Sequence, residues 1–176
     1  MYVLISIFIT YVFYVIYHNI SAFVNKLKSP SSKVFFQHSN KHLQQKLYLH
    51  SRENISHDTV IFRFNLPKMY ISGLPLGKHI NVFAPQSKIN KPAIENLWNG
   101  DHDSINPMVD HIQRSYAPIS KYEDPFIELV IKVYAGDKTQ NSNYPDGGKM
   151  SQYLNTLQIG DAIDVSGPFG SHEYIN

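Results

Sequence analysis

The sequence predicts an all-β domain, a small closed barrel of six antiparallel strands with one helix, preceded by an N-terminal transmembrane helix. Two observations carry this fold class. From Lys46 onward, short runs of β-branched and aromatic residues are interrupted by Gly, Pro, Asn and Asp at close intervals, which is typical of antiparallel strands. Before residue 25, an apolar stretch is long enough to cross a bilayer.

Alternation of apolar and polar side chains defines the expected strands. In a half-buried strand successive side chains point to opposite faces, and this pattern is clear around Phe62 and Phe64. The polar stretch between Pro85 and Gln113 has no period and is expected to be a long surface loop. Six short strands favour a closed barrel. The expected strands are Leu47–Arg52, Thr59–Asn65, His79–Ala84, Gln113–Ala117, Phe126–Tyr134 and Ala162–Ser166.

Composition limits what the chain could do. Its 176 residues suit one folded domain and an attachment segment, because domains most often run to about 100 to 150 residues. The net charge of +2 is small and dispersed, so we expect no nucleic-acid partner. The absence of cysteine excludes disulfides, thiolate metal sites and thiol nucleophiles, so redox chemistry would need a bound cofactor.

Residues 1–25 predict a transmembrane anchor. From Tyr2 to Tyr17 the chain is apolar apart from Ser6 and Thr10. A helix of about 20 residues rises roughly 30 Å, which spans the hydrocarbon core of a membrane. The alternative is a cleaved signal peptide. It is disfavoured because no Lys or Arg precedes the apolar run and no clear cleavage site follows it.

Positive charge after the apolar run predicts the orientation of the anchor. Lys26, Lys28 and Lys33 follow it, and cationic residues prefer the cytosolic side of a membrane. We therefore expect a single-pass membrane protein whose folded domain faces the cytosol. Residues 26–45 show little periodicity and are expected to form a linker, so the barrel domain is placed at residues 46–176.

The one expected helix begins at the glycine pair of Gly147-Gly148-Lys149-Met150-Ser151 and continues through Leu154. The pair leaves backbone amides open at the helix N-terminus, where the helix dipole is positive, so this end attracts phosphate. A plain turn before a helix is the other interpretation.

One segment at a strand end combines a cation, an aromatic ring and hydroxyl groups. It reads Arg114-Ser115-Tyr116-Ala117-Pro118-Ile119-Ser120. Alternation along a strand places Arg114 and Tyr116 on one face. A flavin dinucleotide needs a charge for its pyrophosphate, a planar partner for its ring system and polar contacts at its edge, and this segment supplies each type. An ordinary strand with an exposed arginine and a packed tyrosine is the alternative.

Further motifs make the pattern specific. Ile131-Lys132-Val133-Tyr134 ends one strand, Tyr144-Pro145-Asp146-Gly147-Gly148-Lys149-Met150-Ser151 opens the helix, and Gly167-Pro168-Phe169-Gly170 closes the last strand. Ser56-His57-Asp58-Thr59 and Gly73-Leu74-Pro75-Leu76-Gly77-Lys78-His79-Ile80 precede them. In this order the motifs resemble the FAD-binding domain of the ferredoxin reductase superfamily. The helix motif is most similar to that of NADH-cytochrome b5 reductases.

This resemblance implies a six-stranded antiparallel Greek-key barrel with one capping helix and FAD lying across it. Arg114 would then pair with the FAD pyrophosphate, while Tyr116 would pack against the isoalloxazine ring. Residues 148–151 would wrap the pyrophosphate with backbone amides and one hydroxyl. No catalytic or metal-binding side chain is expected. The expected cofactor contacts are Arg114, Tyr116, Ala117, Pro118, Ser120, Ile131, Lys132, Tyr134, Gly147, Gly148, Lys149, Met150 and Ser151.

The sequence departs from the family pattern in three places. Ala117 stands where the family has threonine or serine, whose hydroxyl can reach the reactive N5 edge of the flavin. The polar stretch between Pro85 and Gln113 is longer than the family's connection, and its His102 and His111 match no metal-ligand spacing. The sequence also stops before a nicotinamide-binding domain. A fragment, a split reductase with that domain on another chain, and a degenerate subunit are the three explanations.

The resemblance implies an oxidoreductase that passes electrons from NADH through FAD to a heme protein such as cytochrome b5. The expected enzyme is an NADH-cytochrome b5 reductase-like flavoprotein, incomplete without its nicotinamide-binding domain, in the endoplasmic reticulum or mitochondrial outer membrane. The alternative is a non-catalytic, membrane-anchored interaction subunit with a degenerate flavin groove.

Overall fold

The computed structural model describes residues 11, 14, 15, 17, 19, 32–89, 99, 110–136 and 144–171. The chain divides into two compact units, Met1–Ser32 and Lys33–Asn176. In the first unit the described residues are helical, apart from Ser32 at its end. No helix formed by the described residues is long and apolar enough to cross a membrane. Most of the anchor expected at residues 1–25 lies outside the described part of the chain.

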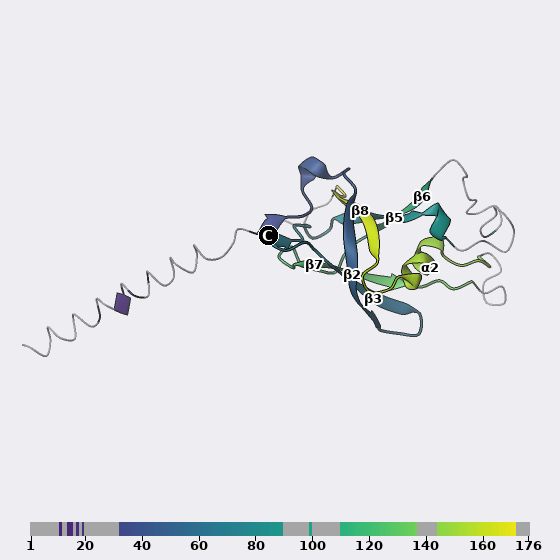
Figure 1. Cartoon of the computed structure of the whole chain (residues 1–176), viewed down its shortest axis with the longest axis horizontal. Coiled ribbons are helices and arrows are strands. Elements are labelled where there is room, and N and C mark those ends of the chain that lie inside the picture. Colours follow the sequence, from purple (N-terminus) through teal and green to yellow (C-terminus); the bar gives the residue numbers. More distant parts are fainter. Residues whose placement is uncertain are drawn as a thin grey trace, which may run out of the picture. The chain divides into compact units, whose positions relative to one another are not determined.

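Six strands form one antiparallel sheet in the second unit (Figure 1). All six expected strands are present, with ends that differ from the expected ones by a few residues. The last strand pairs with the first long strand on one side and with the strand that begins at His79 on the other. The strands are β2 (Gln45–Asn54), β3 (Thr59–Asn65), β5 (His79–Pro85), β6 (His111–Tyr116), β7 (Phe126–Lys132) and β8 (Ala162–Phe169), in the order β6-β5-β8-β2-β3-β7.

The sheet is barrel-like but is not closed by a strand ladder, which corrects the expected closed barrel. In the described residues, β6 and β7 are the two ends of the strand order and share no ladder. The chain after β6 crosses to β7 instead: the Ile119 N–H donates to the Glu128 carbonyl oxygen at 3.0 Å, and the Glu128 N–H donates to Ser120 Oγ at 3.3 Å. Pro118 has no amide hydrogen, so a regular ladder cannot continue through it.

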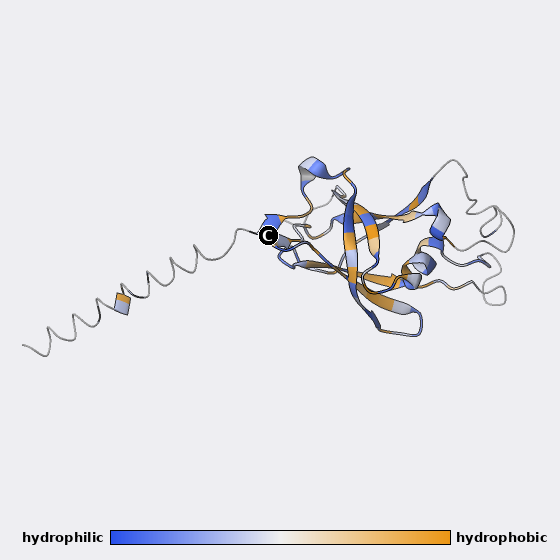
Figure 2. Cartoon of the chain, viewed as in Figure 1, coloured by the Kyte–Doolittle hydropathy of each residue, from blue (hydrophilic) through white to orange (hydrophobic). Residues whose placement is uncertain are grey.

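The core forms where the apolar faces of the strands meet. Phe62 and Phe64 on β3 are fully buried, and the register sets them opposite Leu129 and Ile127 on β7, which are also fully buried. Figure 2 shows the alternation as orange and blue bands along the strands. Burying a side chain of this size stabilises the fold by about 1.5 to 3 kcal/mol.

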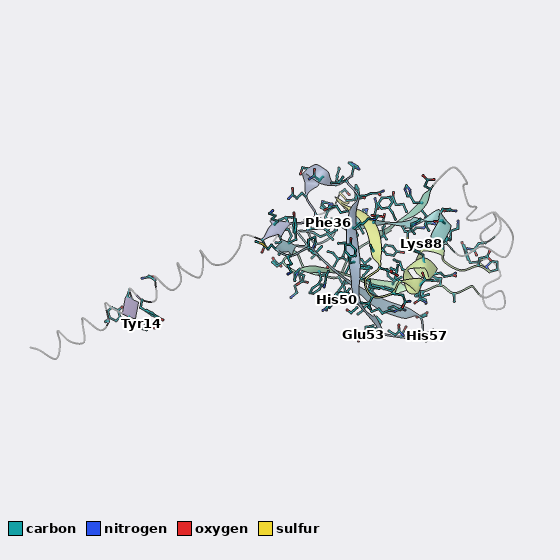
Figure 3. The ribbon with its side chains drawn as sticks, in the orientation of Figure 1. Tyr14, Phe36, His50, Glu53, His57 and Lys88 are labelled. Atoms are coloured by element: carbon teal, nitrogen blue, oxygen red, sulfur yellow. The ribbon has the colours of Figure 1, made fainter. Side chains whose placement is uncertain are left out.

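The folded unit begins at Lys33, within the range expected to be a linker and before the boundary placed at residue 46. Phe35 and Phe36 are only 7% and 2% exposed and belong to the hydrophobic core. Phe36 is labelled in Figure 3 within this unit. Just before them, β1 (Lys33–Val34) pairs in parallel with β4 (Tyr70–Ile71). Two adjacent phenylalanines are too short a run to show a period, so the sequence pattern did not reveal this packing.

The expected helix is confirmed as α2 (Lys149–Thr156), with Gly148 at its N-cap. Met150, Tyr153 and Leu154 are buried, and α2 contacts β6. The helix therefore lies against the strand that carries Arg114. Two short 3-10 helices, η1 (His38–Asn40) and η2 (Gln86–Lys88), complete the described elements.

Candidate functional site

A groove of about 620 Å³ lies between β6, the end of β7 and the start of α2. We call it the β6–α2 groove. Its volume falls in the range of small-molecule sites, roughly 300 to 1,000 Å³. Most of the residues expected to contact the cofactor line it, namely Arg114, Tyr116, Ile131, Lys132, Tyr134, Gly147, Gly148, Lys149, Met150 and Ser151. Asn99, Ser115, Val130 and Tyr144 complete the lining.

The other expected residues, Ala117, Pro118 and Ser120, do not line the β6–α2 groove. They follow β6 on the segment that crosses to β7. The hydroxyl of Ser120 accepts the amide hydrogen of Glu128, so this side chain joins the two strands. Ala117 is exposed.

Arg114 and the helix start lie on the same groove, which is the arrangement that a pyrophosphate requires. Arg114 pairs opposite Val82 in the β5–β6 ladder, and its Nη1 donates to the carbonyl oxygen of Gln113 at 2.9 Å. Tyr116, two residues along the same strand, packs against the core. Burial raises the pKa of the Tyr116 phenol to about 12, against the opposing effect of the Arg114 charge, so this phenol stays protonated at neutral pH.

The glycine pair shapes the loop before α2. Gly147 has φ 69°, a left-handed conformation that glycine adopts without strain. The Gly148 N–H donates to the carbonyl oxygen of Tyr134 at 2.9 Å, so this amide is used within the protein. The Ser151 hydroxyl accepts from the Tyr134 N–H and donates to the Gly148 carbonyl oxygen, both at 3.1 Å. These hydrogen bonds join the loop and the first turn of α2 to the end of β7.

The amides that can face a phosphate begin later than expected. The first hydrogen bond within α2 runs from the Gln152 N–H to the Gly148 carbonyl oxygen at 3.0 Å. The amides of Met150 and Ser151 therefore have no acceptor within the helix, and in the described structure no side chain caps this end. Lys149 is buried and lines the groove at the same point.

A second groove, of about 1150 Å³, adjoins the first. We call it the hairpin groove, because the β2–β3 hairpin forms one wall; Glu53 and His57 lie near the end of that hairpin (Figure 3). Lys132 and Tyr134 line both grooves. Arg52, on the hairpin, donates from Nη1 to the Asn155 carbonyl oxygen at 2.9 Å and from Nη2 to Asn155 Oδ1 at 2.6 Å, which ties β2 to the end of α2.

Asp58 holds Lys132 at the boundary of the two grooves. The Lys132 ammonium lies 3.1 Å from one carboxylate oxygen of Asp58. The other oxygen accepts from the hydroxyls of Ser56 and Thr59, each at 2.9 Å. Hydrogen bonds from Ser56, Thr59 and Lys132, in that order, lower the pKa of Asp58 to about 2.

Asp58→Asn is expected to make stability less dependent on pH in acid. A carboxylate whose pKa is lowered on folding stabilises the protein above its unfolded pKa, 3.8, and this contribution disappears as the pH falls through about 2. In the variant the free energy of unfolding should vary less between those two pH values, as measured by urea unfolding at several pH values. Glu123→Gln, at an exposed turn carboxylate, is the control. An unchanged pH dependence in Asp58→Asn would contradict this role of Asp58.

Some residues that line the two grooves were not predicted from the sequence. Tyr144 opens the motif that precedes α2 and could have been included on that ground. Asn99 lies in the polar stretch without a period, so no local signal pointed to it. Arg52 and Asn155 in the hairpin groove are distant in sequence and are brought together only by the fold.

Comparisons with known proteins identify the family of the chain. Residues 46–95 and 96–174 match the family described as the oxidoreductase FAD-binding domain. NADH-cytochrome b5 reductase 2 of Danio rerio is 37% identical over 143 residues, which cover 80% of this chain and 39% of that protein. NADH-cytochrome b5 reductase 2 of Gallus gallus is 42% identical over 126 residues, covering 70% of this chain and 34% of that protein.

A solved structure supports the same assignment. The cytochrome b5 reductase domain of Ulva prolifera nitrate reductase matches with a TM-score of 0.61 and 29% identity, over 78% of this chain and 45% of that one. The chain spans less than half the length of these relatives. The chain therefore belongs to the oxidoreductase FAD-binding domain family, and within it to the cytochrome b5 reductase type.

Proposed function

We propose that this protein is the flavin-carrying part of an NADH-dependent reductase and that FAD lies in the β6–α2 groove. One observation carries the proposal: Arg114 and the start of α2 line the same groove. A cation facing a helix N-terminus provides both charge and hydrogen-bond donors for a pyrophosphate. When bound, FAD supplies the chemistry that links two-electron donors to one-electron acceptors.

Different residues of the groove would bind different parts of FAD. Arg114 would form charge-assisted hydrogen bonds to the pyrophosphate, and the amides of Met150 and Ser151 would bind it from the helix end. Tyr116, protonated and packed against the core, would support the flavin ring system. Lys132 stands at the boundary with the hairpin groove, held by Asp58, and would contact the adenine or ribose part of the cofactor or the approaching nicotinamide.

The electron donor and acceptor are inferred from the relatives. The relatives are named as NADH-cytochrome b5 reductases, so we place this protein between NADH and a heme protein such as cytochrome b5. A nicotinamide-binding domain, in the same chain or in a partner, would deliver the hydride. Since no side chain needs to act as nucleophile or general base, the protein's part is binding, orientation and electrostatics.

The proposal is tested by the visible absorption of the purified protein after incubation with FAD and removal of unbound flavin. We expect the absorption bands of oxidised flavin, at one equivalent of FAD per chain. Denaturation should release the FAD, which chromatography identifies. A well-folded protein that stays colourless would overturn the proposal. That result would favour the second candidate, a non-catalytic interaction subunit. Ala117 supports this candidate, because it has a methyl group where a hydroxyl could contact the flavin edge.

We also propose that residues 1–25 anchor the protein in a membrane, with the folded unit on the cytosolic side. The apolar run before Asn19 and the lysines that follow it support this. Resistance of the full chain to alkaline extraction from membranes, lost when residues 1–25 are deleted, is the corresponding measurement. Extraction of the full chain into the alkaline supernatant would overturn the anchor.

A further inference from the structure

We propose that Asn99 is a positioning residue for the phosphate end of the β6–α2 groove. This inference rests on the proposed function. Asn99 is 5% exposed and is the described residue of the polar stretch between Pro85 and Gln113 that lines the groove. Asn99 is not among the cofactor contacts that the resemblance of the sequence implies.

Asn99 is bound to the loop before α2 by three hydrogen bonds. Its backbone N–H donates to Asp146 Oδ2 at 2.8 Å, and its side-chain Nδ2 donates to the Gly147 carbonyl oxygen at 2.9 Å. In return, the Asp146 N–H donates to Asn99 Oδ1 at 2.8 Å. Both polar atoms of the side chain are therefore engaged by backbone groups of the same loop.

The residue type suits this position. Asn99 has φ 53°, in the left-handed region, where asparagine is found several times more often than most other non-glycine residues. An asparagine amide also offers one donor and one acceptor side by side, which matches a backbone N–H and the carbonyl of the next residue. A residue of another type would lose either the conformation or the paired hydrogen bonds.

Gln152 and Tyr134 also bond the loop before α2. Gln152 Nε2 donates to the Asp146 carbonyl oxygen at 2.6 Å, and the Gly148 N–H donates to the Tyr134 carbonyl oxygen. The loop is therefore hydrogen-bonded to Asn99, Gln152 and Tyr134 where it leads into the first turn of α2. The Asp146 carboxylate, bonded by the Asn99 amide, is not part of the groove lining, which keeps a negative charge from facing the pyrophosphate.

Asn99→Gly tests this role, because glycine accepts the same backbone conformation and removes only the two side-chain bonds. Binding of FAD and of riboflavin to the full chain, freed of flavin, is followed by flavin fluorescence. Riboflavin has the ring system and lacks both phosphates. We expect the Kd for FAD to rise about tenfold, as the loss of two hydrogen bonds that shape a site would give, and the Kd for riboflavin to change by less than about twofold.

Met69→Gly is the matched control. Met69 has φ 68° and is 55% exposed, and it lines neither groove, so the same kind of replacement there should leave the Kd for FAD unchanged. An unchanged Kd for FAD in Asn99→Gly, or equal weakening of FAD and riboflavin, would overturn the positioning role. If the unaltered protein binds no FAD, the proposed function itself fails, and that result is distinguishable from either of these.

Discussion

Arg114→Ala is expected to weaken FAD binding by about 10- to 150-fold while leaving the protein folded. The loss corresponds to one charge-assisted contact, worth about 1.5 to 3 kcal/mol. Folding should be little affected, because the side chain is exposed on β6, and substitutions at exposed positions usually change the free energy of unfolding by less than about 0.5 kcal/mol. Titration of the flavin-free protein with FAD, together with its thermal unfolding midpoint, measures both quantities.

Arg63→Ala is the matched control for Arg114→Ala. Arg63 also lies on a strand of the sheet, but its guanidinium pairs with Glu128 at 2.7 Å and lies over the ring of Phe126, and it does not line the β6–α2 groove. Its loss should lower stability and leave the Kd for FAD unchanged. Arg114→Lys should give an intermediate Kd, because lysine keeps the charge without the planar pair of donors. Equal FAD affinity in Arg114→Ala and the unaltered protein would remove Arg114 from the site.

The parts of the fold that have a local pattern could be predicted from the sequence. Alternation decides which face of a strand is buried, so the burial of Phe62 and Phe64 follows from β3 alone. The glycine pair could also be recognised from the sequence, because a left-handed turn at Gly147 before a helix restricts the residue types allowed there. Since Arg114 lies on a strand and Gly148 caps a helix, both halves of the proposed phosphate site could be located from local patterns.

Contacts between distant segments have no such pattern. Asn99 reaches Asp146 across 47 residues, from a stretch with neither helix nor strand periodicity. Phe35 and Phe36 are buried because the chain before them pairs with β4, and nothing in two adjacent phenylalanines predicts that pairing. The prediction of a closed barrel was wrong for the same reason. Whether β6 meets β7 in a ladder depends on the path of the chain through Pro118 and not on either strand alone.

Gly147→Ala is expected to weaken FAD binding by more than about 100-fold and to lower the free energy of unfolding by about 2 to 5 kcal/mol. A Cβ at Gly147 would overlap the Tyr134 carbonyl oxygen and would lie 2.7 Å from the Ala135 carbonyl carbon and 2.8 Å from Gln152 Nε2. Two of these atoms are backbone, so the loop itself must move. Moving it breaks its bonds to Tyr134 and shifts the first-turn amides of α2.

Gly160→Ala separates this clash from backbone strain. Gly160 has φ 93°, and a Cβ there would meet no atom within 4 Å, so alanine imposes the left-handed cost of about 1 to 2 kcal/mol and nothing more. Its thermal midpoint should fall by only a few degrees, and its Kd for FAD should equal that of the unaltered protein. If Gly147→Ala and Gly160→Ala lost the same stability and both kept FAD, the loop before α2 would not be the part of the fold that binds the pyrophosphate. Selective loss of FAD from Gly147→Ala would instead tie cofactor binding to the contact between this loop and the end of β7.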